Sequence, residues 1–176
     1  MKSRTLYTMM ALTVMSFLLC ISCQESQHQR DLAIQEQLRA QLVLYIDSCW
    51  NKQDSKLLGQ LATSGFIRHL NGIRVAKSAN EMEAHMKVFF SAFPDLEISI
   101  TETDITGSKI FVLWQATGTN TGIYGEVAAT GKKVKINGMS QLYFDEIGKL
   151  YREDVYFNEL DLLQQLGYTL TFPNLE

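Results

Sequence analysis

The spacing of apolar residues changes near Pro94 and divides the chain into two halves. Before that proline, apolar residues recur three or four positions apart, as on one face of a helix. A long helix is predicted from Asp31 to about Asn51. A second long helix is predicted to begin at the capping box of Ser78 and Glu81 and to end at Pro94. A shorter helix and an extended segment lie between them, so the first half is predicted to be mainly helical.

After Pro94, apolar and polar residues alternate with a period of two, which is typical of strands with one buried face. Turns that contain glycine separate the alternating segments. Strands are predicted at about residues 96–100, 109–117, 121–127, 132–144 and 150–158, followed by a short helix at 161–166. Helices followed by an antiparallel meander indicate an α+β fold, in which the helices cover one face of a curved sheet and form a cone with a pocket.

The last predicted strand has two chemically different faces. Alternation places Arg152, Asp154, Tyr156 and Asn158 on one face, and Tyr151, Glu153, Val155 and Phe157 on the other. The first of these faces is either an ordinary hydrated sheet surface or the wall of a site.

The first 22 residues have the pattern of an export signal. Lys2 and Arg4 precede an uncharged apolar run that ends at Ser22 and Cys23. This pattern resembles a bacterial lipoprotein signal, in which cleavage precedes Cys23 and lipid is attached to it. A plain secretory signal and an uncleaved anchor are the alternatives. We expect a lipoprotein of the cell envelope that faces the periplasm or the exterior, with residues 23–30 as tether, 31–170 as domain and 171–176 as tail.

Composition and charge restrict the function of this domain. The chain has 176 residues, of which 46% are hydrophobic, enough for one core. Loss of residues 1–22 would leave 14 basic and 19 acidic residues, a net charge of −5, which argues against a nucleic-acid partner. Cys49 would then be the one thiol not committed to lipid. Its helical apolar position predicts a buried small hydrophobe rather than a nucleophile.

A set of short motifs gives the chain a resemblance to a known family. The motifs are Trp50-Asn51-Lys52-Gln53-Asp54, Phe66 to His69, Phe93-Pro94-Asp95-Leu96, Trp114 with Gly118-Thr119, Gly122, Thr130-Gly131-Lys132, Gly148-Lys149 and Gln165-Leu166-Gly167. In order and spacing they resemble the SnoaL-like polyketide cyclases, or ester cyclases, over residues 31–167. That resemblance implies a cone-shaped α+β barrel of the nuclear transport factor 2-like superfamily. It also implies cofactor-free acid–base catalysis, and it allows a homodimer through the exposed sheet face.

Such catalysis needs a carboxylate in an apolar pocket and a donor for the developing oxyanion. We expect Asp154 as the base, with Tyr156 or His69 as catalytic partners. Tyr45, Trp114, Arg152 and Asn158 are the expected ligand-binding residues. The alternative for Asp154 is a structural ion pair with Arg152.

Two functions therefore remain open at the level of sequence. The first is a cofactor-free cyclase, isomerase or lyase that acts on a small apolar carbonyl compound. The second is a non-catalytic domain that binds a small ligand or a partner at the envelope, because the family pattern has acids where this chain has Arg152 and Asn158. The three histidines lack metal-ligand spacing, so no metal site is predicted.

Overall fold

The structure is a computed structural model that describes residues 25, 27–126 and 128–171. The predicted signal sequence, the cleavage position and Cys23 lie outside these residues. Within the described part, no helix is both long enough and apolar enough to cross a membrane.

The helices form where the helical periodicity predicted them, except that the first helix begins before Asp31 and includes residues 27–30, which were expected to belong to the tether. A helix over residues 27–43 continues directly as a π-helix, η1 (Leu44–Asn51), and a short turn, η2 (Ser55–Leu57), leads into α2 (Leu58–Leu61). The apolar stripe of the first helix is buried, and Cys49 is fully buried within it. Burial raises the pKa of the Cys49 thiol to about 12, which agrees with a hydrophobic rather than a nucleophilic role.

The long helix α3 (Ala79–Ala92) has the predicted capping box. The Ser78 hydroxyl accepts a hydrogen bond from the Glu81 backbone N–H, and the Glu81 carboxylate accepts one from the Lys77 N–H. The last helix, α4 (Glu159–Leu166), ends at Gly167 in the left-handed region, with φ 107°.

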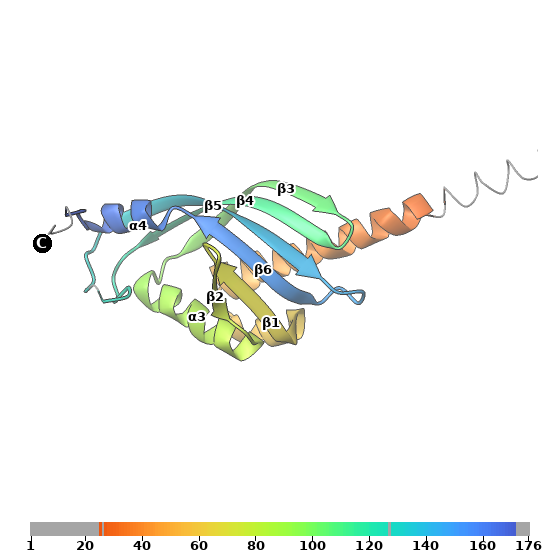
Figure 1. Ribbon diagram of the computed structural model, residues 1–176, viewed down its shortest axis with the longest axis horizontal. Helices are drawn as coiled ribbons and strands as arrows, with labels where there is room; N and C mark the ends of the chain where they lie inside the picture. Colours follow the sequence, from red (N-terminus) through yellow and green to blue (C-terminus); the bar gives the residue numbers. More distant parts are fainter. Residues whose placement is uncertain (1–24, 26, 127, 172–176) are drawn as a thin grey trace, which may run out of the picture.

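Six strands form one curved sheet: β1 (Ala62–Leu70), β2 (Ile73–Ala76), β3 (Glu97–Thr106), β4 (Lys109–Thr119), β5 (Lys133–Phe144) and β6 (Leu150–Phe157). Their order is β2-β1-β6-β5-β4-β3, and β1 pairs with β6 in parallel while all other pairs are antiparallel. The sheet is not closed, since β2 and β3 are its edges. Figure 1 shows the N-terminal helix and α3 on one side of this curved sheet. The predicted α+β fold, a curved sheet covered by helices, is confirmed.

The strand predicted at residues 121–127 is wrong for the residues that the structure describes there. Residues 121–126 form a loop, and the backbone N–H groups of Thr121 and Gly122 donate to the Ala92 carbonyl at the end of α3. A Cβ at Gly122 would lie 1.9 Å from the Ser91 carbonyl oxygen, so the approach requires glycine. The buried Asn120 side chain ties the loop by bonding to Gly122 and Thr130.

A bulge sets the orientation of side chains in β6. Tyr143 pairs with Arg152 but Phe144 pairs with Leu150, which leaves Tyr151 as an extra residue. Leu150 is therefore buried, whereas Tyr151 is exposed and its ring lies 6.1 Å from that of Tyr143. The predicted alternation is wrong at Tyr151, because the bulge turns it away from the face that carries Glu153.

Candidate functional site

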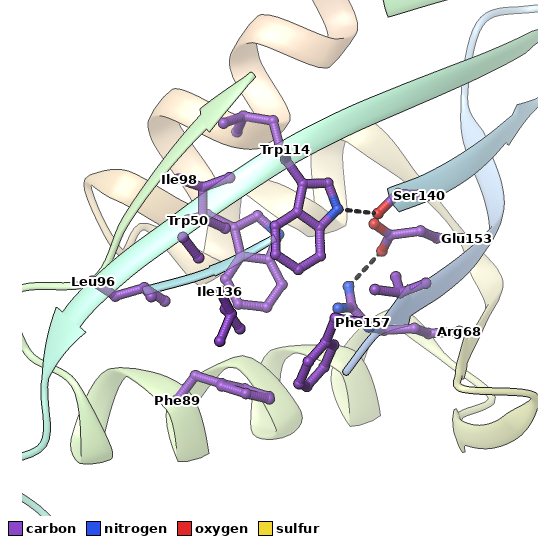
Figure 2. Close-up of a pocket in the computed structure, with 13 residues that line it drawn as sticks. Trp50, Arg68, Phe89, Leu96, Ile98, Trp114, Ile136, Ser140, Glu153 and Phe157 are labelled. Carbon is purple, nitrogen blue, oxygen red and sulfur yellow. Dashed lines mark hydrogen bonds and ion pairs between the residues drawn. The ribbon is translucent and has the colours of Figure 1, made fainter. Parts of the chain in front are cut away.

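A cavity lies between the inner face of the sheet and the helices. Its empty volume is about 540 Å³, counted together with the open space at its mouth. The apolar wall consists of Ile46, Trp50, Phe89, Leu96, Ile98, Trp114, Ala116, Ile136, Val155 and Phe157. The polar lining residues are Arg68, Ser140 and Glu153 (Figure 2).

Glu153 is the centre of a buried polar network. Its Oε2 lies 2.5 Å from Arg68 Nη1 and accepts a hydrogen bond of 2.7 Å from the Tyr45 hydroxyl. The same Arg68 Nη1 donates to the Tyr45 oxygen at 3.2 Å. Glu153 is 3% exposed, Arg68 5% and Tyr45 2%. A full ion pair is therefore enclosed in an apolar wall. Such a pair is tolerated only when it is well hydrogen-bonded, and here Tyr45 adds a second hydrogen bond to Glu153 Oε2.

Three separate elements hold this network. Glu153 comes from β6, Arg68 from the neighbouring parallel strand β1, and Tyr45 from η1. Burial and, next, the nearby Glu153 charge raise the pKa of Tyr45 well above its usual value. The phenol therefore stays protonated and remains a donor to Glu153.

The π-helix η1 brings two site residues together. In this helix type, residues five positions apart lie on the same face, because each turn contains an extra residue. Tyr45 and Trp50 have that spacing, and their rings meet edge to face with centroids 6.4 Å apart. The guanidinium carbon of Arg68 lies 5.1 Å from the centroid of the Trp50 ring. The irregular helix thus supports both the hydroxyl and the ring that contact Arg68.

Some polar atoms at the cavity are left without a protein partner. Trp114 Nε1 donates to Ser140 Oγ at 3.0 Å (Figure 2). The bonds to Glu153 all use Oε2, and Oε1 takes part in none of them. Arg68 Nε is buried and has no hydrogen-bond partner among the described residues. Among the described residues, Glu153 Oε1 is therefore left without a protein partner, whereas Arg68 Nε has almost no accessible surface from which to bind a ligand.

Asp154, the predicted base, lies on the opposite face of β6 and does not line this cavity. Arg152 binds it through two contacts, Nε to Oδ1 at 3.0 Å and Nη2 to Oδ2 at 2.8 Å. His69 Nδ1 also donates to Oδ1, at 2.8 Å. Burial alone would raise the pKa of Asp154, but hydrogen bonds from Arg152, His69 and Tyr143 outweigh it and lower the pKa. The structure thus places Asp154 in the ion pair that was its alternative.

The other predicted site residues divide between the two sides of the sheet. Trp114 lines the cavity, whereas Tyr45, which was expected to bind the ligand, is not a lining residue and donates a hydrogen bond to Glu153. His69 and Arg152 accompany Asp154 on the outer face, where Tyr156 is 48% exposed. Asn158 caps α4 by accepting a hydrogen bond from the Asp161 N–H. The prediction that the face of Arg152 and Asp154 lines the pocket is wrong.

Sequence reasoning missed Glu153, Arg68 and Ser140, although one signal was present. Glu153 shares a strand face with Val155 and Phe157, and the hydrophobic effect turns the more apolar face inward. That face therefore had to line the cavity and carry its carboxylate. Among the described residues, no group of three or more His, Cys, Asp or Glu side chains is arranged to hold a metal ion.

The fold has clear counterparts among solved structures. The chain resembles the solved structure of a SnoaL-like polyketide cyclase from Jannaschia sp. CCS1, with a TM-score of 0.71 and 19% identity over 77% of this chain and 94% of the other. AclR, a putative hydroxylase from Streptomyces galilaeus, is similar with a TM-score of 0.67 and 21% identity, over 78% of this chain and 85% of AclR. A phenazine biosynthesis-related protein from Pseudomonas aeruginosa is similar with a TM-score of 0.68 and 15% identity, over 85% of this chain and 97% of the other.

These likenesses between structures concern the fold alone. No curated protein sequence is significantly similar to the chain. The sequence model of the SnoaL-like polyketide cyclase family, however, matches residues 40–166, which is most of the chain and includes the whole cavity lining. The chain therefore belongs to the SnoaL-like polyketide cyclase family.

Proposed function

We propose that the cavity binds a small, mostly apolar carbonyl compound and that Glu153 moves a proton on its carbon skeleton without a cofactor. One observation carries this proposal: among the described residues, Glu153 is the carboxylate of the lining, and it sits in an apolar wall with Oε2 held by two hydrogen bonds and Oε1 by none. The role first assigned to Asp154 thus passes to Glu153, because Asp154 lies outside the cavity.

The reaction follows from the positions of these groups. Glu153 Oε1 takes a proton from the carbon next to the carbonyl, and the C–H electron pair moves into the carbonyl group to form an enolate. The Ser140 hydroxyl belongs to the same lining and stabilises the enolate oxygen as a hydrogen-bond donor, next to the positive charge of Arg68. The enolate carbon then attacks a second carbonyl, which closes a ring, and the new alkoxide takes the proton held by Glu153. Alternatively, the enolate recovers that proton at another position, which isomerises the compound.

Arg68 and Tyr45 position the base in this mechanism. They fix Glu153 by two hydrogen bonds to Oε2, so the carboxylate has one orientation when a substrate arrives. They also compensate its charge in surroundings that exclude water.

A specific observation supports a second candidate, a domain that binds such compounds without changing them. Arg68 lies 2.5 Å from Glu153, so the carboxylate is already engaged by a cation and can serve as part of the wall of a binding site. Asn158, where the family pattern has an acid, serves as a helix cap.

Deuterium exchange separates the two candidates without knowledge of the natural substrate. We expect the protein to speed exchange of the protons next to the carbonyl of α-tetralone in deuterated water, followed by NMR. Glu153→Gln should reduce the catalysed rate by about a hundredfold or more, since one acid–base group typically contributes that much. The matched control Asp154→Asn, one residue away on the outer face, should keep the wild-type rate.

Exchange that persists in Glu153→Gln, or that is lost in Asp154→Asn, would contradict the role of Glu153. Binding of α-tetralone by the wild type without any catalysed exchange would instead establish the second candidate.

We also propose that Cys23 anchors the domain to the cell envelope, on the basis of the export-signal pattern. Growth with a labelled fatty acid should label the wild-type protein but not the Cys23→Ala variant. Labelling that persists in the variant would refute the anchor.

A further inference from the structure

We propose that Gly138 limits the size of the ligand that the cavity accepts, because it leaves room for the Trp114 indole to lie against the sheet. Gly138 is not itself a lining residue and acts through Trp114, which is one. It is therefore a positioning residue that determines specificity. The inference rests on the proposed function in assuming that the cavity binds a small apolar molecule.

Gly138 lies in the middle of a row of three residues that crosses the inner face of the sheet. It pairs with Trp114 of β4 on one side and with Phe157 of β6 on the other. Both aromatic residues line the cavity, and their ring centroids lie 6.2 Å apart. Ile136 and Ser140, which flank Gly138 on the same face of β5, are buried and line the cavity too. The glycine thus leaves a gap in a row of larger side chains.

The Trp114 indole fills this gap. A Cβ on Gly138 would lie only 2.8 Å from Cε2 of the Trp114 ring and closer still to Cζ2 and Cη2. The indole Nε1 donates to Ser140 Oγ at 3.0 Å, so two residues of β5 fix the position of the ring (Figure 2).

The close approach of the ring explains a glycine in the interior of a strand. Glycine weakens a strand, and it often marks a place where another group comes close. Gly138 does not have a positive φ, so its backbone conformation is open to alanine. The contact with Trp114, and not the backbone, is therefore what requires glycine here.

A methyl group on Gly138 would push the indole into the cavity. The ring is bounded by β5 on one side and by Phe157 on another, and the cavity is the open space beside it. Since the clashing atoms lie at the end of the Trp114 side chain, the ring can turn while the backbone of β4 stays in place. The displaced ring would lose its bond to Ser140 and fill space that a ligand needs.

Gly138→Ala tests this with two ketones of different size, the two-ring α-tetralone and the one-ring cyclohexanone. The chain has two tryptophans, Trp50 and Trp114, and both line the cavity, so NMR titration of their indole N–H signals in the purified full chain measures Kd. We expect the Kd of α-tetralone to rise about tenfold or more, because space for a group of this size is typically worth that much. The Kd of cyclohexanone should rise by less than about threefold.

The position of the ring also has a readout that needs no ligand. Without the bond to Ser140, the Trp114 indole N–H signal should shift in Gly138→Ala, and its exchange with solvent should become about tenfold faster or more. The indole signal of Trp50 serves as the internal reference.

A double-mutant cycle shows whether Gly138 acts through the Trp114 ring. In a Trp114→Leu background the ring is gone, so Gly138→Ala should change the Kd of α-tetralone by less than about twofold. The matched control is Gly65→Ala in β1, where a Cβ meets nothing within 4 Å and φ is not positive. This control should keep the wild-type Kd for both ketones.

The outcomes separate the inference from the proposed function. Equal weakening of both ketones, an unshifted Trp114 signal, or the same loss in the Trp114→Leu background would overturn the role of Gly138 while cavity binding stands. So would a Gly138→Ala chain that circular dichroism shows to be unfolded, because the ring would then have no freedom to move into the cavity. If the wild type binds neither ketone, the proposed function fails together with the inference.

Discussion

Glu153 and Asp154 are neighbours in β6, and each is buried and paired with an arginine, yet they lie on opposite faces of the sheet. Glu153 faces the cavity, and its partners Arg68 and Tyr45 are 85 and 108 residues away in sequence. Asp154 faces outward, and its arginine, Arg152, is only two residues away in the same strand.

The exposure of the two arginines shows how different the pairs are. The Arg68 side chain is 6% exposed, whereas that of Arg152 is 44% exposed. Water and salt screen the outer pair, but the inner pair sits where an uncompensated charge is costly. An arginine–carboxylate pair therefore forms part of the hydrated surface on the outer face, as Arg152 and Asp154, and part of the cavity lining on the inner face, as Arg68 and Glu153.

The largest expected difference comes from removing each arginine. Arg68→Ala leaves Glu153 buried without a cation and should lower the free energy of unfolding by about 3–5 kcal/mol. Arg152→Ala should lower it by no more than about 1 kcal/mol, since Asp154 keeps His69 and Arg152 is half exposed. Urea denaturation measures both, and equal losses would remove the distinction between the two pairs.

Truncating a side chain on the inner face of β6 should also lower the free energy of unfolding more than truncating one on the outer face, by a smaller margin than for the arginines. Val155 is 1% exposed on the inner face, whereas Tyr156 is 48% exposed on the outer face. We expect Val155→Ala to cost about 1–3 kcal/mol because it leaves a void in the core. Tyr156→Ala should cost about 0.5 kcal/mol or less. Thermal denaturation of the two variants tests this. A larger loss of stability for Tyr156→Ala would contradict the assignment of the core to the face of Val155.

Acid should weaken the outer pair in a predictable direction. The pKa of Asp154 is lowered in the folded state despite burial, through its bonds to Arg152 and His69. A lowered folded pKa gives stability that is present above the unfolded pKa, about 3.9, and is lost as pH falls through the folded value. Asp154→Asn should therefore reduce the loss of stability below about pH 4. Urea midpoints of wild type and variant across this range measure it, and parallel curves would contradict the assignment.

The smallest effect should be that of salt. At about 1 M salt the screening length is about 3 Å, so the cost of Arg152→Ala should shrink by a few tenths of a kcal/mol. The cost of Arg68→Ala should remain, since solvent ions do not enter the buried pair. Repeating the urea experiment at low and high salt gives the comparison, and equal salt dependence would show that the inner pair is hydrated.

Much of the fold could be predicted because local chemistry decides it. Ser78 and Glu81 begin α3 and Gly167 ends α4, since caps satisfy the backbone groups of their own helix ends. The helical stripe around Cys49 marked a buried face in the same way. By contrast, the parallel pairing of β1 and β6 and the loop at residues 121–126 depend on contacts between distant segments, such as Thr121 and Gly122 with Ala92.

The sequence by itself determined the periodicity, the helix caps, the family and the existence of two chemically different faces on β6. Only the tertiary structure decided which face became the cavity wall. The packing of Val155 and Phe157 against the core placed Glu153 on the inner face, and Asp154 pairs with Arg152 on the outer face. Alternation along a strand separates its faces, whereas their environment depends on what the rest of the chain packs against each of them.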